Sequence, residues 1–185
     1  MKRTFIATRI EPSTELLNAY TKLRNELENE KIKWVDPEIF HLTLFFIGDT
    51  EEESIAEIGN ELSNLVDQLE KTTIRLQGLG VFKNIHKPRV LWAGIEDFEG
   101  LRRIKTLLDK TLLQLGFVPD NREFKPHLTL ARIKWLDDKN KLNELLDIYR
   151  GQFFQVASIS EIVYYESILK PSGPVYKPIE RFVLP

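Results

Sequence analysis

The chain has 185 residues, a formal net charge of −2, three histidines and no cysteine. This length fits one domain or two small lobes, with a hydrophobic core large enough to be stable without disulfide cross-links. The absence of cysteine excludes disulfide frameworks, thiol nucleophiles, cysteine-ligated zinc and iron–sulfur clusters. The slightly acidic balance disfavours a protein that coats a long nucleic acid, whereas binding of a short piece or of one end stays open.

The first half of the chain alternates strand-like and helix-like segments. β-Branched residues predict a strand over 3–10, and leucines at helical spacing predict a helix over 12–30. The apolar run 41–47 has the composition of a strand, and the capping-box pattern at 50–53 predicts that the next helix begins there. A strand pattern returns at 72–82.

The second half of the chain repeats this order. The string His-Leu-Thr-Leu at 41–44 recurs at 127–130, an offset of 86 residues that also aligns Ala7 with Ala93. An internal duplication accounts for the repeat, and we expect a single bilobal domain over 1–185 whose halves face each other across a shared cleft. The halves are roughly 1–86 and 87–185, and the elements predicted in the second are strands over 90–95, 127–133, 158–168 and 175–183 and helices over 98–115 and 137–149.

Each copy of the repeated string offers one imidazole and one hydroxyl on the same face of a strand. Because alternate side chains share a face, His41 and Thr43 point away from the core, as do His127 and Thr129, while the leucines between them point inward. One imidazole can accept a proton while the other donates one, since the ordinary pKa of histidine is about 6.5. Two hydroxyls can donate hydrogen bonds to an oxyanion. This pair suits in-line displacement at phosphorus with base and acid on opposite sides, and it requires no metal and no cofactor.

The third histidine lies outside this pattern. A lone histidine is more often solvated or satisfied by its neighbours than catalytic, and we interpret His86 in this way. His41 and His127 differ because they occupy equivalent positions in a duplicated chain.

Four stretches extend the pattern beyond the histidine strings. They are Arg-Thr-Phe-Ile-Ala at 3–7, Phe-His-Leu-Thr-Leu-Phe-Phe-Ile-Gly-Asp at 40–49, Arg-Val-Leu-Trp-Ala-Gly at 89–94 and Phe-Lys-Pro-His-Leu-Thr-Leu-Ala-Arg at 124–132. With them the chain resembles the 2H phosphoesterase superfamily, and within it the RNA 2',3'-cyclic phosphodiesterases, also called 2'-5' RNA ligases, over nearly its full length. The resemblance implies an α+β fold of two pseudo-symmetric lobes, in which antiparallel sheets line a central cleft and helices pack outside.

The resemblance also implies roles for the repeated residues. His41 would give a proton to the leaving 3' oxygen, and His127 would take one from the attacking water. Thr43 and Thr129 would hold the non-bridging phosphate oxygens, and the product would be an RNA end with a 2'-phosphate. The same groups would join a cyclic end to a 5'-hydroxyl in the reverse direction. The symmetry of the sequence alone does not say which histidine is the acid.

A fifth site residue is expected on the second histidine strand. An arginine that matches Arg132 contacts phosphate in relatives, but strict alternation puts Arg132 on the face opposite His127. It reaches the cleft only if the strand bulges or ends near Ala131. The first repeat has Phe46 at the matching position, so this function would be asymmetric.

Other residues near the strings allow two interpretations. Alternation puts Phe45 on the face of His41, where it can support a base, although a core role is favoured. A group of cations is either a rim for the RNA backbone or a set of scattered solvated charges. These cations are Lys83, Lys87, Arg89, Lys125 and Lys134, and the tryptophans taken as packing residues are Trp34, Trp92 and Trp135.

The expected function is therefore metal-independent hydrolysis of RNA 2',3'-cyclic phosphate ends, of which tRNA-like fragments are one source. Two alternatives stay open: a phosphodiesterase for small cyclic nucleotides left by tRNA splicing, and a non-catalytic RNA or nucleotide binder. No apolar run approaches the about 20 residues of a membrane span, and Arg9 interrupts the apolar start before it resembles a secretory signal. We expect a cytoplasmic monomer that stays outside membranes.

Overall fold

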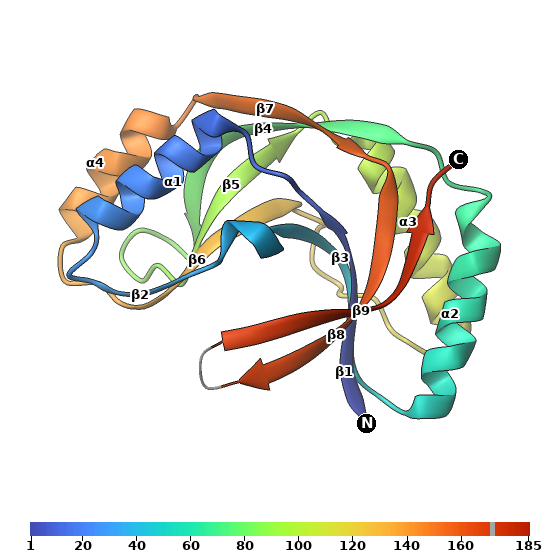
Figure 1. Ribbon diagram of the computed structural model, residues 1–185. Coiled ribbons are helices and arrows are strands. Elements are labelled where there is room, and N and C mark those ends of the chain that lie inside the picture. The colour runs from blue at the N-terminus through green and yellow to red at the C-terminus, as the bar shows by residue number, and fades with distance from the viewer. Residues whose placement is uncertain (171–172) are drawn as a thin grey trace.

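The fold of the chain is given by a computed structural model that describes residues 1–170 and 173–185. Its described part holds two antiparallel sheets, four α-helices and a short 3₁₀ helix, η1 (Figure 1), so the expected α+β class is confirmed. In chain order the elements are β1 (Lys2–Arg9), α1 (Thr14–Glu26), β2 (Lys31–Trp34), η1 (Pro37–Ile39), β3 (His41–Thr50), α2 (Glu52–Val66), β4 (Thr72–Phe82), β5 (Val90–Glu96), α3 (Glu99–Gln114), β6 (His127–Trp135), α4 (Lys139–Tyr149), β7 (Phe153–Ile159), β8 (Glu161–Lys170) and β9 (Gly173–Val183).

The two halves of the chain exchange strands between the sheets. Sheet A has the order β3-β1-β8-β9, and sheet B has the order β2-β6-β5-β4-β7. The connection 83–89 is short, so β4 and β5 pair as an antiparallel hairpin and β4 joins the sheet of the second half. In return β8 pairs with β1 of the first half. Strands β3-β1-β8 therefore correspond to β6-β5-β4, and each sheet contains strands of both halves.

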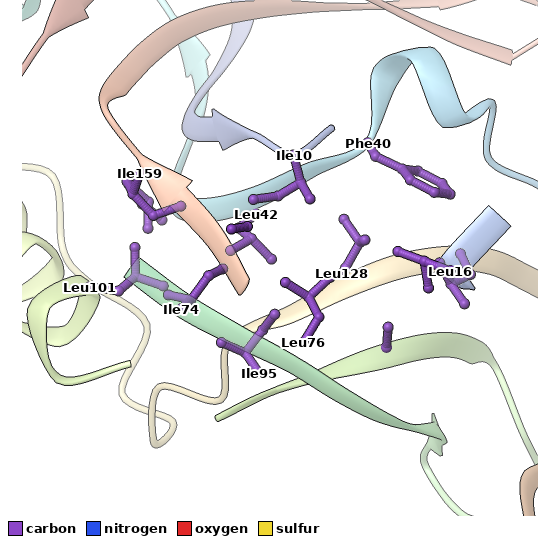
Figure 2. Close-up of a cluster of buried hydrophobic side chains, with 14 of the residues drawn as sticks. Ile10, Leu16, Phe40, Leu42, Ile74, Leu76, Ile95, Leu101, Leu128 and Ile159 are labelled. Carbon is purple, nitrogen blue, oxygen red and sulfur yellow. The ribbon is translucent and has the colours of Figure 1, made fainter. Parts of the chain in front are cut away.

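One main hydrophobic cluster connects the two sheets and the helices. Figure 2 shows Leu42 of β3 and Leu128 of β6 in this cluster, together with Leu16 of α1 and Leu101 of α3. Burying one such leucine contributes about 1.5–3 kcal/mol. Since the leucines of both histidine strands are held in the core, the histidines and threonines that alternate with them face the other way.

The helices lie in two pairs beside the sheets (Figure 1). The pair α1 and α4 is linked by an ion pair of Glu26 with Lys141 at 2.7 Å, and the pair α2 and α3 is in direct contact. Helix α3 touches both β3 and β4, so it packs against both sheets. No helix in the described part of the chain is long and apolar enough to cross a membrane.

Three predictions about local structure are wrong. The capping box fails because Thr50 ends β3, where its hydroxyl bonds to that of Thr4 at 2.7 Å, and α2 begins at Glu52 without a side-chain cap. The predicted strand 158–168 is two strands, β7 and β8, which meet at Ser160 without a glycine or proline to mark the break. The alignment of Ala7 with Ala93 is shifted by one residue, as the register of the histidine strands shows below.

Candidate active site

The two histidine strands have matching neighbours. In sheet A, Thr43 of β3 pairs with Ala7 of β1, and in sheet B, Thr129 of β6 pairs with Trp92 of β5. Trp92, not Ala93, is therefore the counterpart of Ala7. Strands β3 and β6 also contact each other although they belong to different sheets. The duplicated strings thus lie together at the junction of the two sheets.

A bulge follows the threonine in both strands. On β3 the pairing passes from Thr43 directly to Phe45, and on β6 it passes from Thr129 directly to Ala131. A bulge inserts one residue and shifts the alternation of the faces. The two residues after each threonine consequently both point into the core: they are Leu44 and Phe45 on β3, and Leu130 and Ala131 on β6.

The bulges reverse the faces that strict alternation gives to Phe45 and Arg132. Phe45 is buried in the core and does not share the face of His41. The next residues, Phe46 and Arg132, return to the histidine face and are exposed. Arg132 thus lies on the face of His127, and its positive charge acts on the pKa of both His127 and His41. The structure therefore gathers all five residues predicted for the site.

Both imidazoles are held by a hydrogen bond to the backbone. Nδ1 of His41 lies 2.8 Å from the carbonyl oxygen of Ile39, and Nδ1 of His127 lies 2.9 Å from that of Lys125. A carbonyl oxygen only accepts, so Nδ1 is the donor in each case. Nε2 of each ring is left to exchange a proton with a substrate.

The site favours the neutral form of both histidines. Burial lowers the pKa of His41 below its ordinary value of 6.5; the bond to Ile39 raises it, and the charges of Arg132 and His127 lower it further. Burial likewise lowers the pKa of His127, with an opposing contribution from its backbone bond and a further lowering by Arg132. The influence of His127 on His41 also indicates that the two rings are near each other.

Aromatic rings enclose the two histidines unequally. The ring of His41 lies 5.4 Å from that of Phe5 and 4.9 Å from that of Tyr176, measured between centroids. His127 has Phe82 edge-on at 4.7 Å. Phe5 and Tyr176 belong to a small second cluster on the site face of sheet A. Sheet A therefore presents an aromatic wall to the site.

Sequence reasoning misses these aromatic neighbours and Lys33. Tyr176 reaches His41 because β8 and β9 join β1, and Lys33 joins the site face because β2 pairs with β6. Both depend on strand pairings between distant parts of the chain. The sequence offers one indication for placing Tyr176 and Lys33, which is the alternation of polar and apolar residues within their strands, and this alternation does not identify the partner strand.

His86 lies apart from the two strings, and Lys125 has another partner. His86 is exposed in the turn 83–89, with its backbone N–H bonded to Asn84. Lys125 forms an ion pair with Glu123 at 3.2 Å. Within residues 1–170 and 173–185, no three histidine, aspartate or glutamate side chains gather as metal ligands would.

The three tryptophans have three different environments. Trp34 packs edge-on against Tyr20, as expected of a packing residue, whereas Trp135 is 61% exposed. The ring of Trp92 lies against Gly80 of β4, where a Cβ atom would come within 2.4 Å of it. Trp92 therefore forms part of the site floor beside Thr129, in addition to packing against Phe82.

Comparison with known proteins decides the family. The family model described as LigT like Phosphoesterase matches residues 10–92 and 95–176. The chain belongs to this family. An RNA 2',3'-cyclic phosphodiesterase of Aeropyrum pernix is 37% identical over 165 residues, which is 88% of this chain and 93% of that protein. Another of Methanothermobacter thermautotrophicus is 32% identical over 184 residues, or 98% of each chain.

Solved structures agree with this LigT-like assignment. The protein TT0787 of Thermus thermophilus matches with a TM-score of 0.79 and 29% identity over 98% of this chain and 97% of that one. E. coli LigT complexed with 3'-AMP matches with a TM-score of 0.76 and 22% identity over 99% and 98% of the two chains. The expected membership of the 2H phosphoesterases and the expected fold are both confirmed.

Proposed function

We propose that the chain hydrolyses RNA 2',3'-cyclic phosphate ends to 2'-phosphomonoesters. One observation carries the proposal: two imidazoles from duplicated strands meet at one site, each with Nδ1 bound to a carbonyl and Nε2 left for proton transfer. Relatives at 37% and 32% identity bear the name RNA 2',3'-cyclic phosphodiesterase, which supports this substrate class.

The reaction divides proton transfer between the histidines. Nε2 of His127 takes a proton from water as the water oxygen bonds to phosphorus. The bond from phosphorus to the 3' oxygen breaks, its electron pair goes to that oxygen, and Nε2 of His41 supplies the proton. The lowered pKa of His127 keeps the base neutral at pH 7. The negative phosphate, once bound, favours the protonated form of His41.

The remaining site residues stabilise charge on the phosphate. Thr43 and Thr129 donate hydrogen bonds to the two non-bridging oxygens from opposite sides. Arg132 supplies positive charge near both histidines, so the charge that develops on the phosphoryl oxygens in the transition state is stabilised. Side chains provide the acid, the base and the counter-charge, and we propose that no metal or cofactor takes part.

The same groups act as a ligase when a 5'-hydroxyl replaces water as the nucleophile. If a 5'-hydroxyl takes the place of the attacking water, its proton goes to the base, the 3' oxygen leaves with the proton of the acid, and a 2'-5' phosphodiester forms. Because water is far more concentrated than RNA ends, hydrolysis dominates unless a second strand is bound.

The test is the identity of the product. An oligonucleotide that ends in a 2',3'-cyclic phosphate is incubated with the protein with and without EDTA, and the end is analysed. We expect a 2'-phosphate at equal rates in both. A 3'-phosphate, or loss of activity with EDTA, would contradict the proposed reaction.

A further inference from the structure

Strand β2 gives sheet B an extension that sheet A lacks. Sheet A ends at β3, whereas sheet B continues past β6 to β2. In this extension Lys33 of β2 lies directly opposite Arg132 of β6. Cross-strand partners share a face, so Lys33 lies on the face of Arg132 and His127.

A third cation joins this face. Lys134 lies in a second bulge of β6, between Ile133, which pairs with Ile32, and Trp135, which pairs with Lys31. Ile133 is buried in the core whereas Lys134 is exposed, so its side chain lies on the side away from the core, which is that of Arg132. The ammonium group of Lys33 lies beside the β8–β9 hairpin, because a Cβ atom at Gly173 would come within 3.1 Å of its Nζ. The three cations therefore line a strip between β6 and the hairpin.

Protein stability does not account for this strip. Like charges placed directly opposite each other destabilise a sheet. In the described part of the chain, none of Lys33, Arg132 and Lys134 forms an ion pair with a carboxylate, so no negative charge offsets their repulsion. A local arrangement that costs stability is expected at a functional site, and cations gathered on the face of His127 suit a ligand with several negative charges.

The strip extends beyond the reacting phosphate. The Cα atoms of Thr129 and Lys134 are at most about 16 Å apart, five residues at 3.3 Å per residue, and the bulges after Thr129 and Ile133 shorten this distance. Lys134 still lies farther along β6 from Thr129 than the width of one phosphate group. A 2',3'-cyclic phosphate is the 3' end of its strand. Any further phosphate of that strand therefore belongs to nucleotides on the 5' side.

We propose that Lys33 and Lys134 form a second phosphate subsite for the RNA backbone on the 5' side of the cyclic end. This inference rests on the proposed function and narrows its substrate class. The subsite makes the chain prefer oligonucleotide ends over small cyclic nucleotides, because a cyclic mononucleotide has no second phosphate to place there.

The test compares two substrates with the same reacting end. One is a nucleoside 2',3'-cyclic phosphate, and the other is a tetranucleotide whose 3'-terminal nucleotide carries the same 2',3'-cyclic phosphate. We expect the double variant Lys33→Gln, Lys134→Gln to lose about tenfold in kcat/KM on the tetranucleotide and less than twofold on the mononucleotide. The slope of log affinity against log salt falls by about 0.7 for each lysine removed. Lys110→Gln, which removes an exposed cation from α3, leaves both substrates unchanged.

Two results would overturn the subsite. Equal losses on both substrates place the lysines at the reacting phosphate, and no loss on either shows that the cations are solvated. A binding measurement separates failure of the proposed subsite from failure of the proposed function. If the wild-type chain cleaves neither substrate, fluorescence anisotropy with a 2'-phosphate tetranucleotide at several salt concentrations still decides whether the double variant binds more weakly than the Lys110→Gln control.

Discussion

The strands β3 and β6 carry the same four residues, yet their surroundings differ in kind. Strand β3 is the edge of sheet A, and the rings of Phe5 and Tyr176 enclose His41. Strand β6 lies inside sheet B, where Arg132 follows the histidine and Lys33 of the neighbouring strand β2 lies opposite Arg132. The duplication has kept the two histidines symmetric, while the side chains around them have diverged.

The two repeats differ most at the first exposed residue after each bulge, which is Phe46 on β3 and Arg132 on β6. The same shift of register brings Phe46 to the site face on β3 and Arg132 to it on β6. Phe46 is 71% exposed and its ring lies 6.3 Å from that of Phe5. One repeat therefore offers a ring face and the other a positive charge, which suits a ligand with a base at one end and a phosphate chain at the other.

The largest expected effect tests the part that is symmetric. His41→Ala and His127→Ala are each expected to lower kcat/KM on an RNA 2',3'-cyclic end by about 10³-fold, because each removes one of two proton transfers. His86→Ala, in the exposed turn, serves as the matched control and keeps activity within about twofold. Circular dichroism of all three variants checks that the fold is intact. Full activity of either site variant would place the chemistry elsewhere.

Replacing Arg132 tests the asymmetry directly. Arg132→Gln is expected to lower kcat/KM by about 10²-fold, since a charge that stabilises the transition state is lost. Its removal also raises the pKa of both histidines, so the pH–rate profile moves to higher pH. Arg132→Lys keeps the charge and is expected to keep the profile. An unmoved profile in Arg132→Gln would show that Arg132 does not act on the histidines.

The symmetric part of the site is also the part that the sequence predicts. Alternation within a strand is enough to place His41, Thr43, His127 and Thr129 on one face, because leucines that must be buried separate them. The bulges are different: Leu44 and Leu130 carry no glycine or proline signal, so strict alternation puts both Phe45 and Arg132 on the wrong face.

The asymmetric part depends on pairings that no local pattern specifies. Tyr176 reaches His41 through β8, which pairs Thr4 with Glu166 across most of the chain. Lys33 reaches Arg132 through the four-residue strand β2. Register between distant strands is set by packing in the folded state, and a single sequence does not contain it.

Unequal enclosure of the two rings predicts unequal effects of pH on stability. Both folded-state pKa values lie below the ordinary 6.5, so between them and about pH 6.5 the unfolded chain binds more protons. Stability is therefore fully present above pH 6.5 and falls as the pH drops through this window. Thermal unfolding at about pH 5 to 8 measures it. His41→Gln is expected to flatten the dependence more than His127→Gln, because two aromatic rings enclose His41, and the reverse order would refute this explanation.

The smallest expected effect concerns the aromatic counterpart of Arg132. Phe46 is mostly exposed, so Phe46→Ala should change the free energy of unfolding by less than about 0.5 kcal/mol. If its ring stacks on a base of the substrate, KM rises about fivefold to tenfold while kcat is preserved, since stacking is worth about 1–3 kcal/mol per base. Phe46→Leu keeps the apolar surface and loses the ring, so it separates stacking from simple burial. Steady-state kinetics with a tetranucleotide end measure both constants. A fall in kcat at constant KM would place Phe46 with the reacting groups, and the division into an aromatic and a cationic side of the site would then be wrong.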